Sequence, residues 1–203
     1  MIKVDKIYNK STAVVILAAG LSSRMGIPKP FLEYNNRLLF IDKIIGEYNE
    51  FGCIPIIITI SDNPLWKDVI DRYQSFENIN FVENHHLEYE RFYSVKLGIA
   101  NVGNVDYCFV QNTDNPFVNQ DILSEIYNYK TNDGYIVPTC KGIGGHPILL
   151  SKNVMTGICM ENNNSNLKNV LQGYERVECN VNDEIILVNI NIEQDYLKYF
   201  MTN

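Results

Sequence analysis

Two patterns of apolar residues alternate along the chain. Short runs rich in isoleucine, valine and leucine are typical of strands buried in a sheet, and apolar residues recurring every three to four positions are typical of helices packed on one face. Strands are expected at 13–18, 31–34, 54–60, 79–82, 106–111, 134–138, 146–150, 176–181 and 185–190. Helices are expected at 38–51, 64–73 with Asn63 as N-cap, 91–100, 119–129, 153–160, 165–172 and 193–200.

This order of elements predicts the class of fold. Strands alternate with helices through the first 140 residues, which indicates βαβ units and a mostly parallel sheet covered by helices on both faces. The expected fold is therefore an α/β, Rossmann-like three-layer sandwich, in which ligands bind beyond the carboxyl ends of the strands. Because no repeat or linker interrupts the 203 residues, a single domain over 1–203 is expected.

Composition narrows the classes of partner and compartment. The net charge of −7 argues against general binding to nucleic acid or to an anionic membrane, so a local basic group indicates a site. The five cysteines are scattered without a Cys-x-x-Cys pair, which is typical of reduced core thiols in a cytoplasmic protein. Residues 1–10 are too polar for a signal peptide, and no apolar run has the length of a membrane span.

The first candidate for chemistry is the segment 14–29. An apolar strand gives way to small residues, and Gly20, two serines, Arg24, Gly26 and Lys29 follow within ten positions. Backbone amides of such a loop can surround a phosphate, and the two basic side chains can balance its charge. The spacing matches neither the Walker A loop nor G-x-G-x-x-G. An ordinary connection with basic residues facing water is the alternative.

Residues 17–29, Leu-Ala-Ala-Gly-Leu-Ser-Ser-Arg-Met-Gly-Ile-Pro-Lys, resemble a known signature. The pattern L-A-A-G-x-S-x-R-M-G-x-x-K is that of nucleotidyltransferases of the MobA-like group, which includes the molybdenum cofactor cytidylyl- and guanylyltransferases. The resemblance implies the nucleotide-diphospho-sugar transferase type of fold, and catalytic roles for Arg24 and Lys29. It also implies nucleotide binding by Leu17, Ala18, Ala19, Gly20, Ser22, Ser23, Arg24 and Lys29.

A lone carboxylate, Asp114, follows the strand expected at 106–111. By itself it could simply cap the turn that precedes Pro116. The segment resembles the metal-binding D-Q-P element of the same family, with Asn115 in place of glutamine. The resemblance therefore implies that Asp114 is catalytic and binds Mg²⁺, which prefers one or two carboxylates beside nucleotide phosphates.

A second metal ligand is less well matched. Residues 188–196 resemble the closing D-I-D-T-P-E-D-L element of the family, but Asn189 and Asn191 replace its two acids. An asparagine carbonyl is a weaker but acceptable ligand for a hard cation, so Asn191 is a candidate for Mg²⁺. A plain helix N-cap is the alternative for Asn191, and Asp195 is expected to be a charge at the helix start.

Two further segments match the family. Residues 138–147 resemble P-x-x-x-G-x-x-G-H-P of the cytidylyltransferase branch, which implies that Gly145 and His146 contact the acceptor. The alternative for His146 is a hydrogen-bonded residue at a strand edge. Residues 94–99 resemble S-x-x-x-G-[LI], which implies that Ser94 and Gly98 lie beside the nucleotide, with close packing as the reason for Gly98.

Together these segments imply Mg²⁺-dependent transfer of a nucleotidyl group to a phosphate acceptor of molybdopterin type, with release of pyrophosphate. A phosphate nucleophile is already ionised and needs no strong base, and the sequence offers no Ser/His/Asp or Cys/His constellation. The Ala-Ala-Gly at 18–20 and the Gly-His-Pro at 145–147 favour CTP over GTP by resemblance. A sugar- or alcohol-phosphate acceptor, or a non-catalytic protein that delivers cofactor to a molybdoenzyme, are the alternatives.

Overall fold

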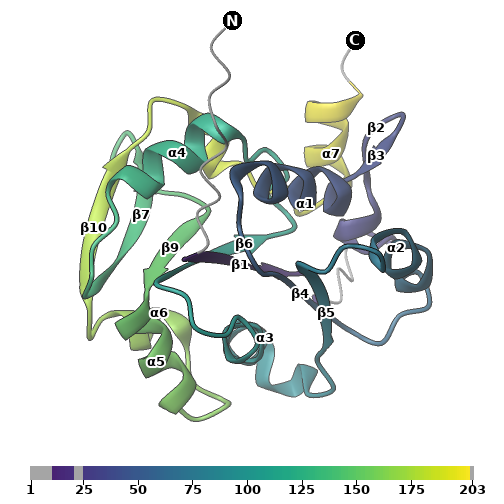
Figure 1. Cartoon of the computed structure of the whole chain (residues 1–203). Helices are drawn as coiled ribbons and strands as arrows, with labels where there is room; N and C mark the ends of the chain where they lie inside the picture. Colours follow the sequence, from purple (N-terminus) through teal and green to yellow (C-terminus); the bar gives the residue numbers. More distant parts are fainter. Residues whose placement is uncertain (1–10, 21–24, 202–203) are drawn as a thin grey trace, which may run out of the picture.

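The β-branched runs form the middle of one sheet (Figure 1). The computed structural model describes residues 11–20 and 25–201. The strand order is β10-β7-β9-β6-β1-β4-β5, with β8 beside β7, and β9 is antiparallel to both of its neighbours. The strands are β1 (Thr12–Leu17), β4 (Ile56–Ile60), β5 (Ile79–Glu83), β6 (Tyr107–Asn112), β7 (Gly134–Cys140), β8 (Ile143–Gly144), β9 (Ile148–Ser151) and β10 (Glu175–Asn180).

Helices cover both faces of this sheet, as expected (Figure 1). One face carries α1 (Phe40–Phe51), α2 (Trp66–Tyr73) and α4 (Gln120–Asn128), and the other carries α3 (Glu90–Ala100), α5 (Lys152–Met160) and α6 (Leu167–Leu171). The small hairpin β2 (Glu33–Asn35) and β3 (Leu38–Leu39) lies beside α1, together with the last helix, α7 (Glu193–Phe200). The mixed α/β class and the mostly parallel sheet are therefore confirmed.

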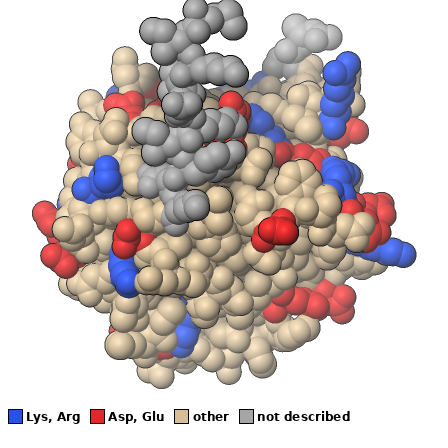
Figure 2. All heavy atoms as spheres, in the orientation of Figure 1, with Lys and Arg blue, Asp and Glu red and all other residues tan. Residues whose placement is uncertain are grey.

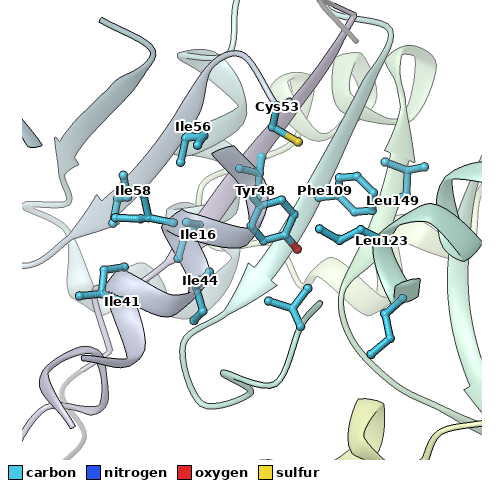
Figure 3. Close-up of a cluster of buried hydrophobic side chains, with 14 of the residues drawn as sticks. Ile16, Ile41, Ile44, Tyr48, Cys53, Ile56, Ile58, Phe109, Leu123 and Leu149 are labelled. Carbon is cyan, nitrogen blue, oxygen red and sulfur yellow. The ribbon is translucent and has the colours of Figure 1, made fainter. Parts of the chain in front are cut away.

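The pleat of the strands builds two apolar cores. In β1, Val14 and Ile16 join the core under α1 and α4, whereas Val15 faces the core under α3. Figure 3 shows Tyr48 of α1 pointing into the first core beside Phe109 and Leu123. Its buried hydroxyl donates a hydrogen bond of 2.9 Å to Oε1 of Gln111, so the polar end of the ring is satisfied inside the apolar layer.

Several expected elements differ in the structure, among them the helix expected at 38–51, whose first two residues form β3. Residues 184–187 form a 3-10 turn, η3 (Glu184–Leu187), where a strand was expected, because the Asp183 carboxylate caps the turn by accepting from the amide of Ile185. The segment expected as a strand at 31–34 begins with a 3-10 turn, η1 (Lys29–Phe31), before β2. Helix α2 starts at Trp66, because Asn63 accepts from the amide of Leu65 in a separate turn.

The structure agrees only in part with what the composition predicts for the cysteines and the surface charge. All five cysteines are free, and four are buried, but Cys159 is exposed and is not a core thiol. Figure 2 shows basic and acidic side chains interspersed over one face, which therefore presents no broad basic surface in its described part. Within residues 11–20 and 25–201, no helix combines the length and the apolar character needed to cross a bilayer.

The winding of the sheet reverses between β1 and β6. From β1 the chain continues through β4 to β5 on one side, whereas β6 and the later strands lie on the other side. The two strands are parallel neighbours, and Leu17 is level with Asn112. The loops that follow β1 and β6 therefore leave the same edge side by side, at the place where open α/β sheets bind ligands.

Candidate active site

The loop after β1 is anchored on both sides at its base. The amide of Ala18 donates to the carbonyl of Thr59 at 2.9 Å, and the hydroxyl of Thr113 donates to the carbonyl of Leu17 at 3.1 Å. Since the Ala18 amide is used by the protein, it is not available to donate to a phosphate. Nucleotide binding by Leu17 and Ala18 stays a prediction.

Gly20 borders open space. A Cβ added at Gly20 would meet no atom of the described chain within 4 Å, so none of the described residues requires glycine there. The space is what a bound anion approaching the loop amides needs. Ala19 before it is almost fully buried. Ser22, Ser23 and Arg24 lie outside the described residues, and their roles stay predictions.

Lys29 connects three distant parts of the chain. It begins η1 directly after Pro28, and its ammonium donates to Oδ1 of Asn191 at 2.6 Å and to Oδ2 of Asp114 at 3.3 Å. The side chains of Lys29 and Asp114 are only 16% and 25% exposed, so solvent screens this pair less than a surface pair. The structure therefore brings together three of the predicted site residues.

Asp114 has one carboxylate oxygen engaged and the other unused. Its Oδ1 is buried and accepts no hydrogen bond from the described residues. Buried carboxylate oxygens without a partner are costly, so this atom is one that a bound ligand could use. The turn that carries it is held rigidly, because the side-chain amide of Asn115 donates to the carbonyls of Ile185 and Ile186 at 3.3 and 3.2 Å. Asn115 is thus a structural residue.

Asn191 faces Lys29 and does not cap α7. The N-cap residue is Ile192, and the Asp195 carboxylate closes the helix start by accepting from the amides of Asn191 and Ile192 at 2.9 and 3.1 Å. The charge expected at the helix start is therefore Asp195, and the capping alternative for Asn191 is wrong. Its amide oxygen accepts from Lys29, and the positive charge of that ammonium disfavours a metal ion on the same oxygen.

The donor set fits a magnesium ion that brings most of its own ligands. In the described part of the chain, no three His, Cys, Asp or Glu side chains converge on one point. Asp114 offers one unused carboxylate oxygen. Magnesium in nucleotide enzymes characteristically takes one or two carboxylates and completes its shell with phosphate oxygens and water. The site therefore suits Mg²⁺ delivered with a nucleotide better than a resident metal.

His146 lies at the same edge of the sheet, before β9. Its amide donates to the carbonyl of Ile186 at 3.0 Å, and its ring Nε2 is 3.2 Å from Nδ2 of Asn112. Burial and the nearby charge of Arg91 lower the pKa of His146 to about 4, although Asp114 opposes this shift. The imidazole is therefore neutral at pH 7, and its buried Nδ1 has no partner in the described residues.

Gly145 has a structural reason to be glycine. A Cβ there would lie 2.5 Å from the carbonyl oxygen of Ile186, so only glycine lets this turn pass so close to η3. The residue is buried, and its amide already donates to the carbonyl of Pro138 at 2.7 Å. The expected contact between Gly145 and the acceptor is therefore not supported by the geometry, unlike that of His146.

Of the two residues on α3 that are predicted to lie beside the nucleotide, the structure also supports one, Ser94, and not the other, Gly98. Ser94 is buried, and its oxygen accepts from Nδ2 of Asn84 at 2.9 Å, which leaves its own hydroxyl hydrogen to donate elsewhere. A Cβ at Gly98 would lie 2.3 Å from Cγ1 of Val15, so this glycine allows α3 to approach the sheet. Close packing is confirmed as the explanation for Gly98, and its position against β1 argues against direct contact with a nucleotide.

Arg91 is a charged residue near this site that the motif analysis did not assign. It lies in the first turn of α3, and its charge helps to lower the pKa of His146. The residue keeps exposed surface, yet nearby protein atoms desolvate the guanidinium enough to lower its pKa, against the effect of Asp114. The sequence feature that could have identified Arg91 is its position three residues before Ser94, at the start of an expected helix.

Comparisons with known proteins agree with this arrangement. Residues 14–177 match the model of the MobA-like NTP transferase domain. A molybdenum cofactor cytidylyltransferase of Escherichia coli is 30% identical over 90% of this chain and 92% of its own length. A probable molybdenum cofactor guanylyltransferase of Clostridium perfringens is 30% identical over 62% of this chain and 58% of its own length.

The fold agrees as well. The crystal structure of a nucleotidyl transferase from Methanothermobacter thermautotroptrophicus superposes with a TM-score of 0.75 at 20% identity, over 95% of this chain and 99% of that one. The order of the strands, the loop after β1 and the match over 14–177 all lead to the same assignment. The chain belongs to the family of MobA-like NTP transferases and is a nucleotidyltransferase.

Proposed function

We propose that this enzyme transfers CMP from CTP to the phosphate of a molybdopterin-type acceptor, with Mg²⁺, and releases pyrophosphate. The observation that carries the proposal is the cluster of Lys29, Asp114 and Asn191 at the switch point of the sheet. It combines a cationic donor with a carboxylate oxygen that has no hydrogen-bond partner among the described residues.

The reaction needs charge stabilisation more than proton transfer. A phosphate oxygen of the acceptor attacks the α-phosphorus of the nucleotide, and the bond from that phosphorus to the bridging oxygen of pyrophosphate breaks. The nucleophile is already an anion, so no side chain has to remove a proton. Lys29 would stabilise the charge that develops on the α-phosphate and on the leaving pyrophosphate, exchanging its contacts to Asn191 and Asp114 for phosphate oxygens.

Asp114 would hold Mg²⁺ through its unused oxygen, and the ion supplies positive charge to the reacting phosphates. The amides from Ala19 onward would bind the triphosphate, since Gly20 leaves open space there. Ser94 is placed to donate its hydroxyl hydrogen to the ribose or the base, because its oxygen already accepts from Asn84. His146 would contact the acceptor as a neutral donor.

The preference for CTP rests on residue 19 and on resemblance. The chain carries Leu-Ala-Ala-Gly at 17–20, where the guanylyl branch of the family carries Leu-Ala-Gly-Gly. A methyl group at residue 19 would narrow the space for the base and disfavour a purine, by about 1–3 kcal/mol for a misfit of this size. The similarity to a protein named as a cytidylyltransferase, over 90% of this chain, supports the same choice. The product would then pass to a molybdoenzyme.

Pyrophosphate release from purified protein tests the proposal. We expect turnover with Mg²⁺, CTP and molybdopterin, a lower kcat/KM with GTP, and a shift toward GTP in Ala19→Gly. Equal or better kcat/KM with GTP would make the enzyme a guanylyltransferase. Turnover only with a sugar or alcohol phosphate would replace the acceptor. Nucleotide binding without pyrophosphate release from any acceptor would instead indicate a carrier that delivers cofactor.

A further inference from the structure

A fully buried glutamine lies at the end of β6, directly before the turn that carries Asp114. Gln111 has no exposed surface, so its side chain cannot touch a substrate. A buried primary amide is costly unless its hydrogen-bonding groups find partners inside the protein. Any effect of Gln111 on the reaction therefore has to act through those partners.

The side-chain amide of Gln111 joins the two ends of this turn. Its Nε2 donates to the carbonyl of Asn112 at 2.7 Å and to the carbonyl of Asn115 at 2.8 Å. These two residues flank Thr113 and Asp114, so a single amide group closes the turn from the inside. Both N–H donors of the amide are used, at ordinary hydrogen-bond lengths.

Tyr48 determines the orientation of this amide. Its hydroxyl, at the end of the ring that points into the core in Figure 3, donates to Oε1 of Gln111 at 2.9 Å. A rotated amide would place Oε1 against the carbonyl oxygens of Asn112 and Asn115, where it could accept nothing. The three partners together leave one orientation, in which both donors face the turn.

We propose that Gln111 is a positioning residue, which closes the turn and so fixes the direction of the Asp114 carboxylate. One oxygen of that carboxylate then faces Lys29, and the other stays available for a ligand. This inference rests on the proposed function, in which the available oxygen holds Mg²⁺.

The turn is also attached to neighbouring segments, but these attachments do not set its curvature. The carbonyl of Asp114 accepts from the amide of Ile190 at 2.8 Å, and the hydroxyl of Thr113 donates to the carbonyl of Leu17. They hold the middle of the turn in place, whereas Gln111 sets the distance between its two ends. Without Gln111, both of those carbonyls lose a donor, and the turn has to rearrange to satisfy them.

Gln111→Met and Tyr48→Phe separate positioning from a general loss of stability. Methionine has a similar length but no donor, so it removes both bonds to the turn. Tyr48→Phe removes a hydrogen bond from the same buried network but leaves both donors of Gln111 in place. Both variants should melt below the wild type, which makes Tyr48→Phe the matched control.

The choice of metal ion in turnover distinguishes the two variants. Mg²⁺ demands near-ideal octahedral geometry, and the larger Mn²⁺ tolerates a displaced carboxylate better. We expect the ratio of kcat/KM with Mg²⁺ to that with Mn²⁺ to fall at least tenfold in Gln111→Met and less than twofold in Tyr48→Phe. If the ratio were unchanged in Gln111→Met, or fell equally in both variants, Gln111 would stabilise the core only and the proposal would be overturned.

Hydrogen exchange of the metal-free protein, followed by NMR, tests the turn without turnover. The Ile190 amide, which donates to Asp114, should exchange at least tenfold faster relative to the Ile58 amide of β4 in Gln111→Met, with this ratio unchanged in Tyr48→Phe. In the wild type, the side-chain amide protons of Gln111 should exchange at least a hundredfold more slowly than those of exposed Gln74.

The outcomes distinguish this inference from the proposed function. Rapid exchange of the Gln111 side-chain amide in the wild type would overturn the inference even if Gln111→Met did not fold. An unchanged exchange ratio at Ile190 in folded Gln111→Met would overturn it while turnover of the wild type stands. Failure of pyrophosphate release with every acceptor would overturn the proposed function and leave the exchange measurements as they are.

Discussion

Two helical glycines are expected to respond in opposite directions to the same substitution. Gly98 lies in α3 against the sheet, where a new Cβ would be 2.3 Å from Cγ1 and 2.9 Å from Cγ2 of Val15, and 3.2 Å from Cγ2 of Thr59. Gly46 lies in α1 on the exposed side, and a Cβ there would meet nothing in the described chain within 4 Å. Alanine therefore gains helix propensity at both positions but creates a clash only at 98.

The magnitude at Gly98 follows from the contact. Val15 is fully buried and β-branched, so it has no free rotamer, and α3 must move outward by about an ångström. Overpacking of this kind lowers the free energy of unfolding by about 3 kcal/mol, the upper end of its usual range. Replacing glycine by alanine in a helix raises it by about 1 kcal/mol. The net loss in the free energy of unfolding is therefore about 2 kcal/mol, which lowers the melting temperature by about 4–8 °C in a chain of this size.

Urea denaturation of Gly98→Ala and Gly46→Ala checks the comparison. We expect Gly46→Ala to be as stable as the wild type or more stable by up to about 1 kcal/mol. Gly98→Ala should also raise KM for nucleotide, because α3 carries Ser94, the residue proposed to donate to the ribose or the base. If Gly98→Ala were as stable as Gly46→Ala with an unchanged m-value, the argument that Gly98 exists for close packing would be refuted.

Further predictions concern the site itself. Lys29→Ala should lower kcat by about 10²–10³-fold, a much larger effect than its effect on folding stability, with the exposed Lys67→Ala as control; near-full kcat in the folded variant would remove Lys29 from the mechanism. Asp114→Ala should abolish Mg²⁺-dependent turnover and Asn191→Ala should weaken it less, as Mg²⁺ titrations of activity will show; unchanged Mg²⁺ dependence in Asp114→Ala would end the metal assignment. The lowered pKa of His146, about 4, means that the unfolded chain binds more protons than the folded one between pH 4 and 6.5. The stability that neutral, buried His146 contributes is thus present above pH 6.5 and lost as the pH falls. Between pH 7 and 5, the free energy of unfolding should therefore fall by up to about 2 kcal/mol more in the wild type than in His146→Gln, as urea denaturation at the two pH values will show. If the free energy of unfolding changed equally with pH in both proteins, the argument that burial lowers the pKa of His146 would be contradicted.

The layout of the sheet was predictable because burial on both faces leaves a strong signal. The runs at 13–18, 54–60 and 106–111 became β1, β4 and β6 with ends shifted by one or two residues. Alternation with helices then placed the loop after β1 beside Asp114, since parallel neighbours end at the same edge. The proposed chemistry depends on this adjacency, which could be predicted from the order of the strands and helices alone.

Contacts made by irregular backbone were not predictable from local pattern. The apolar run at 185–190 has the composition of a strand, but its carbonyls at Ile185 and Ile186 are taken by Asn115 and by the amide of His146. These partners are 40 to 71 residues away in the chain, and a window of neighbouring residues holds no trace of them. The turn η3 therefore forms for tertiary reasons that override its β-like composition.

Arg91 illustrates a second limit. Helical periodicity assigns Phe92, Val95 and Ile99 to the buried face of α3, and they are buried. It says nothing about which polar residue of the first turn reaches the end of the sheet, because that depends on how α3 lies across β1 and β4. Only the structure places Arg91 where its charge helps to lower the pKa of His146.

The contacts of Lys29 explain why Asp114 and Asn191 are not equivalent candidates for Mg²⁺. Asp114 shares one oxygen with the ammonium at 3.3 Å and keeps the other unpartnered, so it can accept a cation without losing Lys29. Asn191 has a single amide oxygen, and Lys29 holds it at 2.6 Å, a hydrogen bond to a charged donor worth about 1.5–3 kcal/mol. We therefore expect Asn191 to bind the ion only when nucleotide phosphates draw Lys29 away. In the proposed mechanism asparagine at 191 is compatible with activity, because the Asp114 carboxylate would be available from the start and the amide would position Lys29 until the phosphates arrive.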